Sequence, residues 1–256
     1  MVVIDLRKGT VPPVLCECDV IIHLAGAPIA HRWTKSYKQL ILNSRIQTAQ
    51  AMWDFLSKSK KRPKIFISAS ATGFYGDRGD ELLDESGAAG NDFLSSVCVE
   101  WEKAANAFAA LGMRVVSVRT AAVLGPHGGI LTKMIPLFRK GLGGKLGTGA
   151  QWFPWIHRDD LVNVYAQAVV DSRFVGPVNA VAPGLVRNIE FTKALGDVLR
   201  KPTIFPVPAF ALRLCLGEFA EALLNSQRVI PKKLERFEFD FLYPEIQEAL
   251  RQIFLA

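Results

Sequence analysis

Three short segments rich in small and hydroxyl-bearing residues each follow an apolar run of the chain. They read HLAGAP from His23, SASATGFYG from Ser68 and RTAAVLGP from Arg119. Small residues let a flat ligand approach the backbone closely, and the hydroxyl groups of Ser68, Ser70 and Thr72 can donate or accept hydrogen bonds. In open parallel sheets, ligands bind beyond the carboxyl ends of the strands. The three segments therefore predict one ligand site, if the apolar runs before them are parallel strands of one sheet.

Alternating strand and helix patterns can supply such a sheet. Strands are expected near Val3 and at 19–24, 64–69, 113–119 and 177–181, and helices at 34–56 (capped by Thr34, with a break near Asn43 and Ser44), 92–111, 130–140, 158–170 and 244–254, with a polar loop at 76–90. This alternation requires crossover connections, which produce a mostly parallel sheet with helices on both faces. We expect one α/β domain followed by a smaller, mostly helical C-terminal lobe.

The run GLGGKLGTG, at 141–149, combines five glycines with one lysine. A phosphate-binding loop follows a strand and opens a helix, so that backbone N–H groups and the helix dipole meet the phosphate. This run instead follows the helical pattern at 130–140 and leads into AQWFPWIH, and its Gly-Lys pair precedes Leu146 rather than Ser or Thr. We expect either a flexible loop that lines a ligand cleft or a plain surface turn.

Composition limits the classes of partner. The 256 residues carry a net charge of +7, no apolar run approaches the ~18 residues of a membrane span, and MVVIDLRKGT lacks the features of a signal peptide. The dense basic run at 58–64 follows a helical pattern, so its cations are expected at a helix C-terminus rather than on a nucleic acid. The four cysteines are expected to be reduced, packed thiols of a cytoplasmic protein rather than metal ligands. We expect a small-molecule partner of anionic character, and no membrane, nucleic acid or metal.

Several other side chains allow two interpretations. His157 begins a helical pattern and could move protons, or pack and cap the helix beside Asp159. Glu100 and Glu102 could act on a ligand, or be solvated or structural. Tyr75 could also move protons. The aromatic residues between the glycine-rich run and that helix could form a wall against a ligand or belong to the core; they are Trp152, Phe153 and Trp155.

The sequence resembles a known family at these same segments. HLAG at 23–26, ATGFYG at 71–76, R-x-x-x-V-L-G-P at 119–126 and WIHRDDLV at 155–162 look like extended short-chain dehydrogenase/reductases. More narrowly, the chain is similar to the NAD(P)-dependent epimerase/dehydratase-like branch, often labelled "cell-division inhibitor" or sugar-nucleotide epimerase family. The segments that carry this similarity are RW at 32–33, SRIQTAQ at 44–50, CVEWE at 98–102 and the long run from GGILTK to PWIH at 128–157. The tail QRVIPKKLERFEFDFLYPEIQEAL resembles the C-terminal lobe of that branch, with Glu235–Arg236 in place of a Gly-containing turn.

The resemblance implies a Rossmann-like, doubly wound parallel sheet, with an NAD(P)-binding domain at 1–185 and a C-terminal substrate lobe at 186–256. It implies NADP, with NAD as the alternative, along Leu24, Ala25, Gly26, Ser68, Ala69, Ser70, Arg119, Thr120 and Ala121. A substrate would lie against Leu146, Gly147, Gln151, Trp152 and His157. Ser70 matches the catalytic hydroxyl of the superfamily, and Thr72 is the second choice.

Two departures from the family pattern bear on function. The family begins with a strand, G-x-x-G-x-x-G, a helix and a second strand, whereas MVVIDLRKG looks like the third strand. The resemblance therefore implies an N-terminally truncated fold with an open apolar sheet edge, in which cofactor binding depends on the missing segment.

The second departure concerns the Tyr-x-x-x-Lys pair, in which the lysine lowers the pKa of the tyrosine so that it can exchange a proton. Phe93 and Val97 stand at those positions, and none of the four tyrosines is followed by a lysine four residues later. We expect an NAD(P)(H)-binding epimerase/dehydratase- or oxidoreductase-like protein acting on an unidentified substrate. The alternative is a catalytically silent regulatory protein that keeps the fold.

Overall fold

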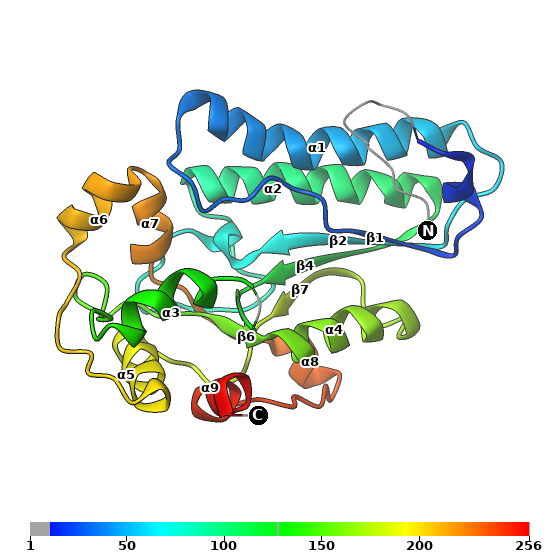
Figure 1. The fold of residues 1–256 in the computed structure, drawn as a ribbon. Helices are drawn as coiled ribbons and strands as arrows, with labels where there is room; N and C mark the ends of the chain where they lie inside the picture. The colour runs from blue at the N-terminus through cyan, green and yellow to red at the C-terminus, as the bar shows by residue number, and fades with distance from the viewer. Residues whose placement is uncertain (1–10, 127, 256) are drawn as a thin grey trace.

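The computed structural model describes residues 11–126 and 128–255, and its centre is a four-stranded parallel sheet (Figure 1). The strand order is β1 (Val20–His23), β2 (Ile65–Ala71), β4 (Arg114–Thr120) and β7 (Gly176–Ala180). Because all four strands are parallel, their carboxyl ends share one edge of the sheet. The expected parallel α/β architecture is confirmed. The strand expected near Val3 lies outside the described residues.

The strands are buried on both faces, as a parallel sheet covered by helices requires. Phe66 and Ile67 on β2 and Val116 and Val118 on β4 have no exposed surface. Ser68, also on β2, is only 1% exposed. Polar side chains are therefore buried near the carboxyl end of this strand, where the sequence predicts the ligand site. In the described part of the chain, β1 and β7 are the edge strands of this sheet, and Ile22 on β1 is 44% exposed.

Two long helices, α1 (Lys35–Ser57) and α2 (Phe93–Asn106), cover one face of the sheet (Figure 1). The expected break near Asn43 and Ser44 is wrong, since α1 runs through both residues. Ser44 Oγ donates to the Ile41 carbonyl oxygen and accepts from the Ala27 backbone N–H. Its hydroxyl therefore ties the helix to a neighbouring segment and does not end it.

The ends of the helices follow the sequence signals closely. Thr34 Oγ1 accepts from the Tyr37 N–H at 3.1 Å and caps α1, as expected. At the other end, Arg62 returns to donate to the carbonyl oxygens of Leu56 (2.8 Å) and Ser57 (2.9 Å). The prediction that the basic run serves a helix C-terminus is confirmed. The helix expected at 92–111 ends at Asn106 and continues as the 3₁₀ helix η4 (Ala107–Leu111).

Helices of the second half of the chain cover the other face and build the C-terminal lobe. They are α3 (Leu131–Arg139), α4 (Arg158–Val170), α5 (Asn188–Leu199), α6 (Ala209–Leu216), α7 (Phe219–Leu224), α8 (Lys232–Arg236) and α9 (Ile246–Leu255). Two small parallel pairs accompany them, β3 (Leu82–Leu83) with β8 (Arg228–Val229) and β5 (Ala122–Leu124) with β6 (Trp155–His157). The 76–90 segment is therefore not only a polar loop, because its two leucines pair with β8 and bury Leu83. Short 3₁₀ turns complete the described elements, η2 (Pro13–Cys16) and η3 (Thr72–Tyr75).

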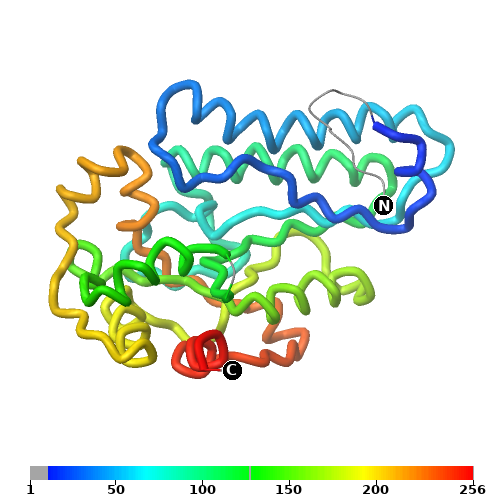
Figure 2. The backbone as a smooth tube through the Cα atoms, viewed as in Figure 1, coloured from blue at the N-terminus to red at the C-terminus, as the bar shows by residue number. Residues whose placement is uncertain are grey.

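The connection after β1 links the sheet to the C-terminal lobe. Figure 2 lets the reader follow residues 24–34 from the end of β1 to the start of α1. Trp33 packs edge-on against Phe93 of α2 at 5.1 Å and against Phe219 of α7 at 5.7 Å between ring centroids. Lys38 forms an ion pair with Glu218 at the start of α7. Among the described helices, none is both long and apolar enough to cross a membrane.

Candidate functional site

The three segments singled out by their small residues meet at the carboxyl edge of the sheet. His23 is paired with Ser68 across β1 and β2, and Ser70 is paired with Arg119 across β2 and β4. The chain leaves these strand ends on the side where α6 and α7 lie (Figure 1). The expected convergence of the three segments is therefore present.

The segment after β1 is the open part of this edge. Leu24 is 61% exposed, and Ala25 and Gly26 are exposed as well. A Cβ atom at Gly26 would lie 2.9 Å from Cζ of Arg45 on α1. Glycine therefore lets the backbone approach the guanidinium more closely than another residue would.

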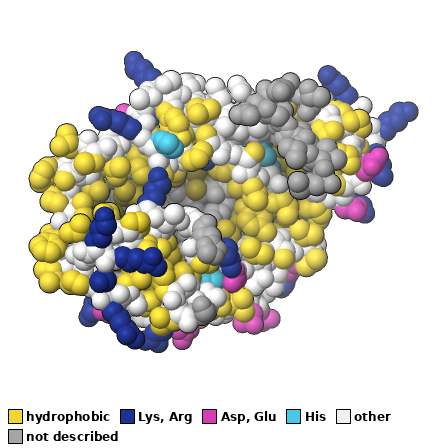
Figure 3. Space-filling model, viewed as in Figure 1, with side chains coloured by type: hydrophobic (Ala, Val, Ile, Leu, Met, Phe, Trp, Pro, Cys, Tyr) yellow, Lys and Arg dark blue, Asp and Glu magenta, His cyan; other side chains and the backbone are white. Residues whose placement is uncertain are grey.

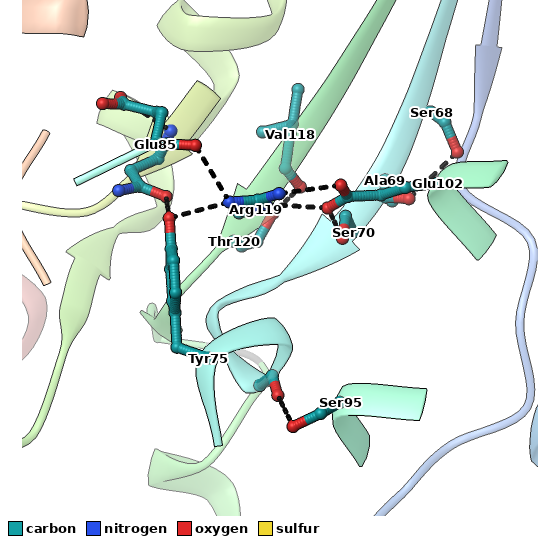
Figure 4. Close-up of polar contacts among 12 residues, drawn as sticks. Ser68, Ala69, Ser70, Tyr75, Glu85, Ser95, Glu102, Val118, Arg119 and Thr120 are labelled. Atoms are coloured by element: carbon teal, nitrogen blue, oxygen red, sulfur yellow. Dashed lines mark hydrogen bonds and ion pairs between the residues drawn. The ribbon is translucent and has the colours of Figure 1, made fainter. Parts of the chain in front are cut away.

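The two serine side chains of β2, Ser68 and Ser70, are buried, and Figure 4 shows the hydrogen bonds that their hydroxyl groups make. Ser70 is 3% exposed, and its Oγ donates to Glu102 Oε1 of α2 at 2.7 Å. Ser68 Oγ donates to the Ala69 carbonyl oxygen at 2.9 Å. Thr72 is buried at the start of η3, while Ala69 is half-buried. The proposed catalytic hydroxyl of Ser70 is thus already bound to a carboxylate.

Arg119 at the end of β4 is held in a buried bidentate ion pair. Its Nε and Nη2 donate to the two oxygens of Glu102 at 2.8 and 2.9 Å, and its Cζ lies 3.5 Å from the centroid of the Phe74 ring. Burial opposes the charge, but the hydrogen bonds and charge of Glu102 outweigh it and raise the pKa of Arg119. The side chain is therefore committed to Glu102. Beyond it on β4, Thr120 is half-buried and Ala121 is buried.

The ion pair continues into a hydrogen-bonded network beneath the strand ends. Arg119 Nη1 donates to the Tyr75 hydroxyl at 2.9 Å, and that hydroxyl donates to Asn179 Oδ1 at 2.7 Å. Tyr75 has no exposed surface, and burial raises its pKa. Glu85 Oε1 accepts from the backbone N–H of Asn179 at 3.1 Å. Figure 4 shows this chain of contacts running from Ser70 to Tyr75.

Sequence reasoning did not find the Glu102–Arg119 pair. The sequence allows Glu102 to act on a ligand or to be solvated or structural; the structure shows a buried side chain paired with Arg119, whereas Glu100 is exposed. A signal was present, because Glu102 shares the spacing of the buried Cys98 and Ala105 on α2. An acidic residue on the apolar face of a helix requires a cationic partner in the core.

The two positions where the family carries Tyr and Lys are filled by packing side chains. Phe93 and Val97 of α2 belong to an apolar cluster with Trp33 and Ile41. The neighbouring Cys98 thiol is also buried, which raises its pKa to about 12. Helix α2 therefore packs against the sheet, and at the two positions where the resemblance places the Tyr and Lys of the proton relay its side chains are apolar.

The glycine-rich run is neither a phosphate loop nor a plain surface turn. It follows α3, as expected, but Gly143 and Gly144 are buried. A Cβ atom at Gly144 would lie 1.7 Å from the Phe205 carbonyl oxygen. Leu146 N donates to Asn188 Oδ1 at 2.8 Å. The glycines are needed because the run packs directly against the backbone of the C-terminal lobe.

Part of the predicted substrate wall forms a connected group. Gln151 Nε2 donates to the Leu146 carbonyl oxygen at 3.1 Å, across the half-buried Gly147. Next to it, Trp152 Nε1 donates to Asp80 Oδ1 at 2.7 Å, and the guanidinium carbons of Arg187 and Arg228 lie 4.5 and 4.9 Å from the Trp152 ring centroid. Trp152 is half-buried, so one aromatic surface and two cations lie together there.

The other aromatic residues and His157 belong to the core. Trp155 is 1% exposed, and the Phe153 ring packs against Phe191 at 4.4 Å. His157 has no exposed surface; its Nδ1 accepts from the Asp159 N–H at 3.2 Å, which caps α4. Burial lowers the pKa of His157. Of its two interpretations, packing and capping describe the observed position.

A second buried cation lies beside Gly26, and sequence reasoning missed it. Arg45 of α1 is 8% exposed, and its Nη1 donates to the carbonyl oxygens of Ile41 (2.8 Å) and Ala27 (3.2 Å). Its Cζ lies 4.7 Å from the Trp101 ring centroid. Burial lowers the pKa of Arg45. The signal in the sequence was its spacing with Ile41, which places both residues on the buried face of α1.

Metal ligands do not gather anywhere in the described residues, where no group of three or more His, Cys, Asp or Glu side chains could hold an ion. The four cysteines are all free thiols.

The parallel sheet with helices on both faces defines a Rossmann-like α/β protein, and comparison with known families agrees. The model of the NAD dependent epimerase/dehydratase family matches residues 6–179, and a domain of unknown function, DUF1731, matches residues 207–253. The chain belongs to the NAD-dependent epimerase/dehydratase family. The resemblance read from the sequence motifs is thereby confirmed.

Curated relatives and solved structures support this assignment. The chain is 41% identical over 235 residues to the epimerase family protein SDR39U1 homolog, chloroplastic, of Arabidopsis thaliana, covering 91% of this chain and 67% of that protein. It is 30% identical to the human epimerase family protein SDR39U1, whose crystal structure contains NADPH, with a TM-score of 0.88 over 98% of this chain and 85% of that one. A nucleoside-diphosphate sugar epimerase from Corynebacterium glutamicum is 37% identical with a TM-score of 0.74; the chain spans 92% of its own length and 46% of that protein.

Proposed function

We propose that this chain binds a nicotinamide dinucleotide, NADP(H) rather than NAD(H), across the carboxyl edge of its sheet. The observation that carries the proposal is the meeting of three small-residue segments at the ends of β1, β2 and β4. Such an edge is where open α/β sheets bind nucleotides. The preference for NADP(H) is supported by the NADPH in the structure of the human relative.

The residues of this edge fit the cofactor in different ways. Leu24, Ala25 and Gly26 are exposed and offer backbone groups and an apolar side chain to a flat ligand. Ser68 and Arg119 are buried and paired within the protein, so we assign them to the support of the strand ends, whereas Ser70, buried beside Glu102, would lie where the cofactor and substrate meet. We keep Ala69, Thr120 and Ala121 as backbone contacts of the proposed site. Figure 3 shows Lys and Arg side chains around a hollow on this face, which favours an anionic ligand.

We propose further that the protein is an epimerase/dehydratase- or oxidoreductase-like enzyme acting on a small molecule, for which the cofactor when bound supplies hydride transfer. The substrate would meet Trp152 and the surface formed by Leu146, Gly147 and Gln151. Ser70 would act together with Glu102, because the Ser70 hydroxyl donates a hydrogen bond to that carboxylate. Thr72 stays the second choice. We also propose a cytoplasmic location, supported by the four free thiols.

A catalytically silent, regulatory dinucleotide-binding protein is the second candidate. Two observations favour it: Phe93 and Val97 pack in an apolar cluster where the family has its proton relay, and the Ser70 hydroxyl is buried against a carboxylate. Such a protein would keep the cofactor as a ligand that stabilises one conformation.

Calorimetric titration with NADPH, NADH and ADP tests the binding proposal. We expect NADPH to bind more tightly than NADH, and ADP to bind weakly; a folded protein that ignores both dinucleotides would refute it. Two assays then separate the two candidates. Absorbance at 340 nm with a panel of carbonyl compounds reports net oxidation of NADPH, and chromatography of a panel of nucleotide sugars reports epimerisation or dehydration, which return the hydride and leave the absorbance unchanged. Turnover that Ser70→Ala abolishes supports the enzyme, whereas binding with no turnover for any compound supports the silent protein.

A further inference from the structure

The positive charge of Arg45 has no acidic partner among the described residues. Its recorded contacts are two carbonyl oxygens and the Trp101 ring, although the side chain is only 8% exposed. The comparison within this molecule is Arg119, which is equally buried but neutralised by both oxygens of Glu102. Taking a cation out of water is unfavourable unless an anion compensates its charge.

The position of Arg45 connects this charge with the proposed cofactor edge. Its Nη1 donates to the Ala27 carbonyl oxygen at 3.2 Å, and its Cζ is the atom that a Cβ at Gly26 would meet at 2.9 Å. Leu24, Ala25 and Gly26 are exposed at this point. The guanidinium therefore lies directly behind the open segment at the end of β1.

A second buried polar group at this strand end also lacks a partner. His23 is 3% exposed, and its Nε2 lies 2.8 Å from Thr48 Oγ1. The Thr48 hydroxyl donates to the backbone of its own helix, so Nε2 carries the proton and Nδ1 is a bare acceptor. Within residues 11–126 and 128–255, no donor forms a hydrogen bond with Nδ1. One buried acceptor is thus left without a donor at the end of β1, close to a guanidinium whose charge no described carboxylate neutralises.

We propose that Arg45 binds a phosphate group at the end of β1, in the first place one of the phosphates of the dinucleotide. A guanidinium presents paired N–H donors that match the oxygens of a phosphate, and the low-dielectric surroundings strengthen the contact. The proposal rests on the proposed cofactor site. It assigns the positive charge that binds the phosphate to Arg45 on α1, and not to the glycine-rich run or to Arg119.

Calorimetry with NADPH on the wild type, Arg45→Met and Arg45→Lys tests the proposal. Arg62→Met is the matched control. It also removes one cation, but from the C-terminus of α1, where Arg62 donates to the carbonyl oxygens of Leu56 and Ser57. We expect Arg45→Met to weaken NADPH binding at least tenfold, Arg45→Lys to weaken it less, and Arg62→Met to change it less than twofold. A folded Arg45→Met that binds NADPH within twofold of the wild type would overturn the assignment.

Two further measurements keep the test decisive. If Arg45→Met does not fold, the ¹⁵N resonance of the Arg45 side chain in the wild type, assigned with Arg45→Lys, reports contact directly. We expect it to shift on addition of NADPH and inorganic pyrophosphate but not of nicotinamide riboside, which has no phosphate; an unmoved resonance refutes the proposal. If the wild type ignores dinucleotides yet binds pyrophosphate through Arg45, the cofactor proposal fails and the phosphate site stands.

Discussion

At the scale of single residues, the two buried arginines have opposite surroundings. Arg119 is neutralised by Glu102 and lies within a network that ends at Asn179, so its cost of burial is offset inside the protein. Arg45 is surrounded by carbonyl oxygens and a ring. The first arginine is therefore neutralised within the protein, whereas the second has no acidic partner among the residues that the structure describes.

Replacement of Glu102 by glutamine tests the first assignment. The variant leaves Arg119 charged and buried without its anion, which typically costs about 3–5 kcal/mol. We expect the free energy of unfolding, measured with urea, to fall by that order. Glu100→Gln, on the same helix but exposed, should change it by no more than about 0.5 kcal/mol. Equal effects of the two variants would contradict the assignment.

His23 should make the protein sensitive to mild acid. Burial, helped by the charge of Arg45, lowers the pKa of His23 to about 4, whereas the unfolded chain titrates near 6.5. Between these values only the unfolded state binds the proton, so stability is complete above pH 6.5 and falls as the pH drops towards 4. The loss attributable to this histidine is up to roughly 3 kcal/mol.

Urea unfolding of the wild type and His23→Asn at pH 7 and pH 4 measures this contribution as a difference. His157, whose pKa is also lowered, acts in the same direction in both proteins and cancels. The gap between the two free energies of unfolding should change by about 3 kcal/mol between the two pH values. A constant gap would show that His23 is not buried as a neutral side chain.

At the scale of elements, the sequence predicts helix ends correctly where hydrogen bonds between residues close in the chain determine them. The N-cap at Thr34 and the cationic end of α1 follow from local hydrogen bonding, and α4 begins and ends at the expected residues. The expectation failed at Ser44 and in the 76–90 segment, where partners distant in the chain decide. For the glycine-rich run, the alternative of a plain surface turn is wrong for the same reason, since Gly143 and Gly144 are buried and pack against the segment at Phe205. The alternative of a loop that lines a ligand cleft stays a prediction.

Gly144 provides a test of that tertiary contact. Its missing side chain lets the Phe205 carbonyl oxygen approach, and a Cβ there would lie only 1.7 Å away. Gly144→Ala should therefore force the backbones apart and lower the free energy of unfolding by about 1–3 kcal/mol, the usual cost of overpacking. Gly128→Ala, where nothing lies within 4 Å, is the control and should be close to neutral in thermal denaturation.

At the scale of the whole molecule, the proposed division at 185/186 separates residues that share one core. Leu124 and Trp155 precede the division, Phe191 and Leu250 follow it, and all four belong to a single apolar cluster. The fold class was predictable because strand and helix patterns alternate along the chain. The site was predictable only as a set of strand ends, since the sequence does not show that Glu102 satisfies Arg119.

Shared packing predicts that the two proposed units do not unfold separately. Far-ultraviolet circular dichroism and tryptophan fluorescence should report one coincident transition in urea for the full chain. A fragment comprising residues 1–185 would leave the Trp155 surface uncovered and should not show a cooperative transition. Two separated transitions in the full chain would instead favour independent domains.

The stacking of Arg45 on Trp101 has an optical consequence. An indole whose face carries a guanidinium has its emission set by that nearby charge, and a phosphate drawn to the same guanidinium would change the field at the ring. If Arg45 binds phosphate as proposed, the emission wavelength and intensity of Trp101, on α2, should change on binding. Because the chain has five tryptophans, this change is the part of the protein's fluorescence response that Trp101→Phe removes.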